Sequence, residues 1–199
     1  MKALKSVTNR LIASFGYELR RSDRLGLNSQ EEAIAAIPRV RANTMVGTSA
    51  LVSLWDIVAY IERVGLSGDL VECGVWKGGA AGFMALSSMH HSRTPRALHL
   101  FDVFDDICPP DPELDGARAV SETRGFAQGK SALEPMSGVY DSMGGAGDAA
   151  AVERFIVQEL GYTGPCVLHV GWFQDTLPNN TLGDIAVLRL DGDWYRSEE

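Results

Sequence analysis

The chain has 199 residues, and its 18 Lys and Arg against 26 Asp and Glu give a net charge of −8. Hydrophobic residues make up 45% and charged residues 22%, a globular composition that excludes a disordered chain. The acidic balance argues against a protein that holds nucleic acid by bulk charge, and three scattered cysteines exclude a disulfide scaffold.

The first 43 residues are expected to form an N-terminal helical extension. Apolar residues at helical spacing predict an amphipathic helix over 1–25 that docks on a partner surface, with a membrane-surface helix as the alternative. Ser29 and Glu32 form a capping-box pattern for a short second helix, which Pro38 closes. Residues 1–19 lack the apolar core of a signal peptide, and no run reaches the roughly 20 residues of a transmembrane segment. The expected compartment is the cytoplasm.

Residues 44–199 alternate between helical and strand patterns. An apolar stripe from Leu51 to Ile61 predicts a helix that ends at Gly65, and two further helices are expected from Gly79 to about Met89 and after Asp148. Short apolar runs predict buried strands over 69–73, 97–101, 166–170 and 185–190. Strands that alternate with helices indicate an α/β domain with a parallel sheet.

The segment 105–147 interrupts this alternation. It begins with Pro109, Pro110 and Pro112 and ends in a Gly- and Ser-rich stretch, without strong periodicity, which is typical of a lid, a binding loop or disorder. Residues 111–122 imitate a calcium loop and 125–131 a phosphate loop. The prolines argue against the first, and the lack of a preceding strand argues against the second.

A glycine-rich turn follows the first predicted strand, with the pattern Glu72-x-Gly74-x-x-x-Gly78-Gly79. Such a turn brings a ligand close to the backbone, and the helix after it offers free N–H groups to an anion. The second glycine of a dinucleotide fingerprint is missing, which disfavours NAD and favours a nucleoside with a charged amino-acid tail. A plain tight turn is the alternative.

Acidic residues also end two of the other predicted strands. Asp102 is placed to accept ribose hydroxyls, unless it is a solvated strand end. Asp191 and Asp193 suit Mg²⁺ or a general base, unless they form a simple Asp-Gly-Asp turn. The four histidines (His90, His91, His99 and His169) show no metal-ligand spacing, and His99 and His169 are expected to be core or boundary residues.

Four segments together resemble the macrocin O-methyltransferase family, whose members methylate sugar hydroxyls of natural products: 44–47, 71–79, 171–178 and 186–195. The resemblance implies an S-adenosylmethionine (SAM) dependent, Mg²⁺-assisted O-methyltransferase with the Rossmann-like sheet of class I methyltransferases. It also implies roles for individual residues. Asp102 would hold the ribose, Asp191 would be a metal ligand and Asp193 the general base. The remaining cofactor contacts would be Met45, Val46, Glu72, Gly74, Trp76, Ala80, Gly171, Trp172 and Phe173.

The sequence departs from the family pattern at its end. Relatives complete the metal site with an acidic pair on a later strand, whereas this chain reads Arg196-Ser197-Glu198-Glu199 and stops, so we expect a sheet that is incomplete at its C-terminus. The alternative function is a truncated, non-catalytic module that binds SAM or its product S-adenosylhomocysteine (SAH), or another protein. The expected acceptor is a small molecule or a glycan, and an exposed sheet edge would favour homo-oligomers.

Overall fold

The computed structural model describes residues 29–92, 94–132 and 134–194, so the helix expected over 1–25 lies outside the described residues. Four parallel strands form one sheet in the order β3-β2-β1-β4. They are β1 (Asp69–Cys73), β2 (Leu98–Asp102), β3 (Cys166–Val170) and β4 (Ile185–Leu190). The predicted α/β class is therefore confirmed, and each strand lies within one residue of its expected position.

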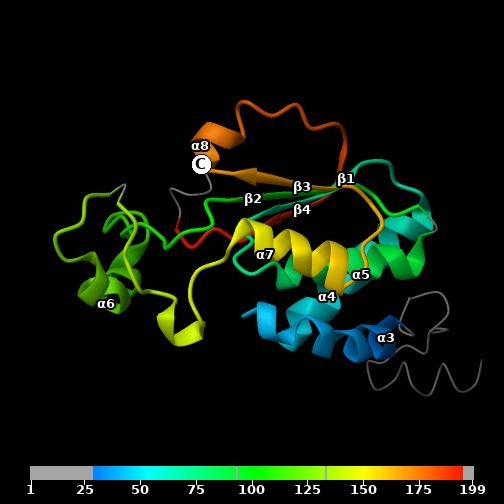
Figure 1. The fold of residues 1–199 in the computed structure, drawn as a ribbon, viewed down its shortest axis with the longest axis horizontal. Helices are drawn as coiled ribbons and strands as arrows, with labels where there is room; N and C mark the ends of the chain where they lie inside the picture. Colours follow the sequence, from blue (N-terminus) through cyan, green and yellow to red (C-terminus); the bar gives the residue numbers. More distant parts are fainter. Residues whose placement is uncertain (1–28, 93, 133, 195–199) are drawn as a thin grey trace, which may run out of the picture.

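Helices cover one face of this sheet (Figure 1). They are α3 (Ser29–Ala36), α4 (Thr48–Val64), α5 (Gly79–His91) and α7 (Ala149–Arg154), which continues as a short π-helix, η4 (Phe155–Glu159). Their inward residues pack with fully buried Leu70, Leu98 and Leu100 of the strands. Burial of each such leucine stabilises the fold by about 1.5–3 kcal/mol. As predicted, α4 ends at Gly65, which adopts a left-handed φ of 66°.

The segment before α4 packs into the same core. After α3, two short 3-10 helices follow, η1 (Ile37–Arg39) and η2 (Arg41–Asn43). Ala33, Ile37 and Val40 are buried in the cluster that α4 and α5 form. Within the described part of the chain, no helix is both long and apolar enough to cross a bilayer.

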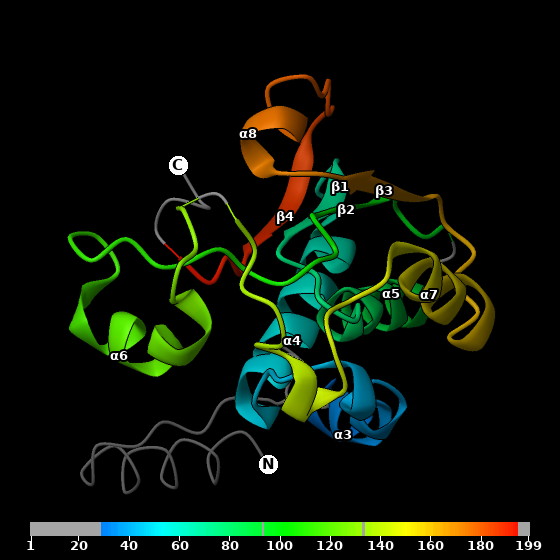
Figure 2. The same ribbon diagram turned by 60° about the vertical axis from the view of Figure 1, so that its left-hand side comes forward.

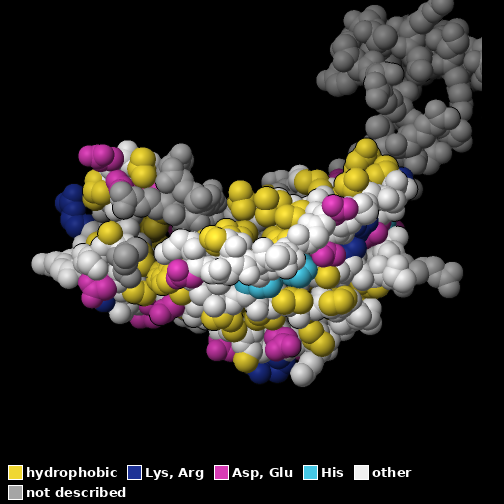
Figure 3. Space-filling model, turned by 90° about the horizontal axis from the view of Figure 1, so that it is seen from above, with side chains coloured by type: hydrophobic (Ala, Val, Ile, Leu, Met, Phe, Trp, Pro, Cys, Tyr) yellow, Lys and Arg dark blue, Asp and Glu magenta, His cyan; other side chains and the backbone are white. Residues whose placement is uncertain are grey.

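The opposite face of the sheet is much less covered. Its small buried cluster consists of Val71, Cys73 and Phe101, against which Phe173 and Leu182 pack. Phe173 begins α8 (Phe173–Thr176), a single helical turn above the sheet (Figure 1). Hydrophobic and histidine side chains are visible on this face (Figure 3). Leu188 and Leu190 of the edge strand β4 are 52% and 50% exposed, so β4 is packed mainly on one side.

The segment 105–147 contains a helix that its weak periodicity did not predict. This helix, α6 (Gly116–Ala127), stands apart from the sheet (Figure 2). Only Ala119 and Thr123 of α6 are buried, so its inward face lacks the large apolar side chains that mark α4. A 3-10 turn, η3 (Asp141–Met143), lies near the end of the segment.

Candidate cofactor and active site

A cavity of about 610 Å³ lies at the carboxyl ends of the strands. The ends of parallel strands meet at one edge of a sheet, and this edge is where open α/β sheets bind ligands. The structure brings all twelve residues singled out from the sequence to the lining of this cavity, although their individual roles remain predictions. They are Met45, Val46, Glu72, Gly74, Trp76, Ala80, Asp102, Gly171, Trp172, Phe173, Asp191 and Asp193.

Gly74 begins the glycine-rich turn that lines the cavity. Its φ is +85°, and a Cβ atom at this position would lie 2.2 Å from the carbonyl oxygen of Asp191. The close approach follows from two backbone hydrogen bonds across the sheet: Gly74 N–H donates to Phe101 at 2.9 Å, and Asp191 N–H donates to Cys73 at 2.8 Å. Only glycine combines this backbone angle with this spacing.

Replacing Gly74 with alanine is expected to lower the free energy of unfolding by about 3 kcal/mol, because left-handed strain and overpacking add together. Gly125, inside α6, is the matched control. It has no left-handed φ and nothing within 4 Å of its Cβ position, so Gly125→Ala should stabilise by about 0.5–1 kcal/mol. Urea unfolding of both variants measures the difference. Equal effects would contradict the close packing at Gly74.

Asp102 organises the same turn through its carboxylate. One oxygen accepts the backbone N–H groups of Val75 at 2.6 Å and Trp76 at 2.9 Å, and the other accepts that of Phe104 at 2.7 Å. Trp76 and Phe104 both have left-handed φ angles, 49° and 53°, which are costly for these residue types. A carboxylate offers about four acceptor positions, so one remains for a ligand hydroxyl.

Glu72 lies fully buried beside Arg189 of β4, in register across the sheet. Arg189 donates to one oxygen of Glu72 and, at 2.6 Å, to Asp191. The other oxygen of Glu72, Oε2, is buried and has no hydrogen-bond partner among the described residues. An unsatisfied buried acceptor costs about 1–3 kcal/mol, so a ligand that donates to Oε2 would regain that energy. Sequence reasoning missed Arg189 because it sits inside an apolar run.

Burial raises the pKa of Glu72 from its ordinary 4.5 to about 8, although Arg189 opposes the shift. The folded protein then binds more protons than the unfolded chain between these two pH values. The contribution to stability is complete below about pH 4.5 and is lost as the pH rises to about 8.

The variant Glu72→Gln cannot titrate at this position. Relative to wild type, it should therefore become more stable by on the order of a few kcal/mol between pH 5 and pH 8. Denaturant unfolding of both proteins at a series of pH values tests this, and other titrating groups cancel in the difference. A constant difference would show that Glu72 is already ionised at pH 5.

Tyr140 holds Asp193 in place in the lining of the cavity. The tyrosine hydroxyl donates to Asp193 Oδ2 at 2.7 Å. Desolvation raises the pKa of Asp193, an effect that the Tyr140 hydrogen bond partly offsets and that Asp191 and Asp102 reinforce. A carboxylate with a raised pKa is a stronger proton acceptor. Sequence reasoning missed Tyr140 because it lies in the aperiodic segment.

The end of the segment 105–147 is fixed to the glycine turn. The indole of Trp76 donates to the carbonyl of Gly145 at 3.2 Å, and Lys77 donates to those of Met143 and Gly144 at 2.7 and 2.9 Å. The beginning of the segment also lines the cavity, including Ile107, Cys108, Pro109 and Pro110. The segment therefore forms one wall of the site, and its role as a lid remains a prediction.

The described residues do not assemble a magnesium site at Asp191. Its carboxylate is paired with Arg189. Among the described residues, the one group of three potential metal ligands lies elsewhere, at Glu32, His90 and His91. Mg²⁺ prefers several oxygen ligands in octahedral geometry, which one guanidinium-paired carboxylate does not supply.

Comparisons with known proteins agree on one family. The family model for macrocin-O-methyltransferase (TylF) matches residues 1–129 and 156–199. The 8-demethyl-8-(2,3-dimethoxy-alpha-L-rhamnosyl)-tetracenomycin-C 4'-O-methyltransferase of Streptomyces olivaceus is 33% identical to this chain. The match covers 78% of this chain and 54% of the length of that enzyme. The demethyldecarbamoylnovobiocin O-methyltransferase of Streptomyces niveus is 32% identical over the same shares.

A solved structure gives the same result. The structure of the O-methyltransferase NovP matches with a TM-score of 0.57 and 30% identity, over 78% of this chain and 58% of that chain. The chain thus spans about half the length of the curated relatives it matches.

Proposed function

Because the chain belongs to the macrocin O-methyltransferase family, we propose that it binds SAM and transfers its methyl group to a hydroxyl of a sugar or glycosylated metabolite. Two curated relatives are named for O-methylation of tetracenomycin and novobiocin compounds, which supports a small-molecule acceptor. The observation that carries the proposal is the unpartnered, buried Glu72 Oε2 beside the glycine turn.

The residues of the cavity fit this cofactor. Glu72 Oε2 would accept the ammonium group of the methionine part, and Asp102 would use its remaining acceptor position for a ribose hydroxyl. Ala80, in the first turn of α5, would place backbone N–H groups near the carboxylate, and Gly171 to Phe173 would border the adenine. A volume of about 610 Å³ lies in the usual range for small-molecule sites.

In this reaction the main task of the protein would be to activate the acceptor hydroxyl. Bound SAM supplies a methyl group on a positively charged sulfur, and the acceptor oxygen displaces that sulfur. A sugar hydroxyl is a poor nucleophile until a base removes its proton. Asp193 would take this proton at Oδ1, while Tyr140 holds Oδ2 by its hydrogen bond. The wall formed by 105–147 would exclude water and hold the acceptor in line with the methyl group.

Magnesium dependence is a separate part of the proposal, with Asp191 as the carboxylate that would contribute. The described residues alone do not fit the ion. SAH binding is expected to be insensitive to EDTA, because Glu72 and Asp102 require no metal to act.

A non-catalytic SAM- or SAH-binding module is the second candidate, and it is favoured by the pairing of Asp191 with Arg189, which leaves no assembled magnesium site among the described residues of the cavity. Among the described strands, β4 lies at an edge of the sheet, a position that would suit such a module for pairing with a second copy.

Thermal-shift titration with SAM, SAH, NAD and NADH tests the cofactor class. We expect SAM and SAH alone to raise the melting temperature. If neither SAM nor SAH raised the melting temperature, both the methyltransferase and the SAM-binding module would be excluded. Transfer of a labelled methyl group to 8-demethyl-8-(2,3-dimethoxy-alpha-L-rhamnosyl)-tetracenomycin C, with and without Mg²⁺, then separates the enzyme from the module.

A further inference from the structure

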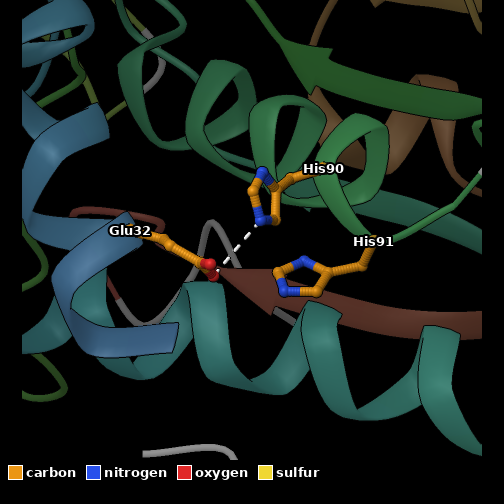
Figure 4. A group of neighbouring side chains, drawn as sticks. All are labelled: Glu32, His90 and His91. Carbon is orange, nitrogen blue, oxygen red and sulfur yellow. Dashed lines mark ion pairs between the residues drawn. The ribbon is translucent and has the colours of Figure 1, made fainter. Parts of the chain in front are cut away.

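A second cluster of potential ligands lies away from the cavity, where α3 meets α5 (Figure 4). It consists of Glu32 of α3 and the adjacent His90 and His91 at the end of α5. One ligand atom from each residue lies within 4.8 Å of the other two. None of the three lines the cavity, so the cluster is independent of the proposed methyltransferase site.

The spacing of two ligand atoms already matches tetrahedral coordination. His90 Nε2 lies 3.2 Å from Glu32 Oε2. Two ligands at about 2.0–2.1 Å from a tetrahedral Zn²⁺ are separated by about 3.3 Å. The carboxylate points toward both imidazole rings (Figure 4), and the two partners are only half-buried, so small side-chain rotations would complete the site.

The surroundings orient both imidazole rings. His91 Nδ1 lies 2.8 Å from the carbonyl oxygen of Ser87, and because a carbonyl only accepts, this contact places the proton on Nδ1. His91 Nε2 therefore keeps a lone pair, as metal-bound histidines require. Trp55 of α4 packs against both rings, with centroids 5.6 Å apart in each case. The ligands are thus held by three helices.

The geometry points to a Zn²⁺ site in which Glu32, His90 and His91 are the protein ligands and water takes the fourth position. Two imidazoles and one carboxylate suit Zn²⁺ and disfavour Mg²⁺, which prefers oxygen ligands throughout. Bound zinc would fasten α3 to α5 and so stabilise the N-terminal part of the described fold. This role is structural, so it does not require a cavity that admits a substrate.

Titration of the untagged, EDTA-treated full chain with ZnCl₂, in competition with a chromophoric zinc chelator, tests the site. We expect one saturable equivalent per chain and no competition from excess MgCl₂. Glu32→Gln, His90→Gln and His91→Gln should each weaken zinc binding at least about tenfold. The matched control is Glu31→Gln, an exposed neighbour on the same helix, which should stay within about twofold of wild type.

Two further readouts separate coordination from loss of fold. ZnCl₂ should raise the melting temperature of wild type and Glu31→Gln but not of Glu32→Gln. Co²⁺ should give visible absorption bands in wild type that Glu32→Gln lacks. The proposal is overturned if no saturable equivalent binds, or if any of the three ligand substitutions weakens zinc binding less than about tenfold. SAH binding by these variants stays unchanged, so the outcome is independent of the proposed function.

Discussion

Asp193→Asn is expected to lower the rate of methyl transfer about 100- to 10,000-fold, the range that general bases contribute. The amide is nearly isosteric but cannot take the proton of the acceptor hydroxyl. SAH affinity should remain within about twofold, because the cofactor contacts proposed here lie on Glu72 and Asp102. Single-turnover methyl transfer and SAH titration, carried out on the same preparation, measure the two effects.

Tyr140→Phe is the matched control for this substitution. It removes the hydrogen bond to Asp193 but leaves the carboxylate in place. That hydrogen bond lowers the pKa of Asp193, so its loss should move the acidic limb of the pH–rate profile to higher pH with a much smaller fall in the maximal rate. If Asp193→Asn retained wild-type turnover, Asp193 would not be the base.

Asp102→Ala is expected to destabilise the fold by about 4 kcal/mol and to abolish detectable SAH binding. The substitution leaves three backbone N–H groups without their acceptor, and each such loss costs about 1–3 kcal/mol when the group is shielded from water. It also releases Trp76 and Phe104 from left-handed backbone angles that the carboxylate helps to hold. Urea unfolding and SAH titration measure both effects.

Asp148→Ala is the matched control, since Asp148 also accepts a backbone N–H, that of Ala151 at 2.7 Å. Asp148 only caps α7, so its loss should cost about 1 kcal/mol and leave SAH affinity unchanged. Asp102→Asn keeps one acceptor oxygen, so its loss in free energy of unfolding should lie between those of Asp102→Ala and Asp148→Ala. Equal costs for Asp102→Ala and Asp148→Ala would contradict the organising role of Asp102.

The strands could be predicted from sequence because their apolar runs are short and bounded by glycine or acidic residues. Asp69 to Cys73 illustrates this, since β1 spans those residues and no others. The helix α6 could not be predicted in the same way. The residues that α6 buries, Ala119 and Thr123, are short or polar, so they do not mark a core-facing side in the sequence as the large apolar residues of α4 do.

The acidic residues of the cavity were accessible from sequence because strand ends in a parallel sheet converge, whereas contacts such as Met45, Val46 and Ala80 were implied only by the resemblance to the family. Glu72, Asp102 and Asp191 lie at or next to the ends of predicted strands, so their meeting in one cavity could be predicted once the strands were assumed to be parallel neighbours. Tyr140 and Arg189 act through partners distant in sequence, so no local pattern marks them. The cluster of Glu32 with His90 and His91 was missed for the same reason, because the packing of α3 on α5 creates it.

The bridge that Arg189 makes from Glu72 to Asp191 has a consequence for strand alignment. Val187 faces the helices, whereas Leu188 and Leu190 lie on the opposite face, so aliphatic residues occur on both sides of β4 and hydrophobicity alone defines its alignment weakly. A slip of one residue would turn Arg189 to the open face and set a leucine against a buried carboxylate. The contact of Arg189 with Glu72 thus discriminates against misaligned docking of β4, and the cavity forms only in the correct alignment.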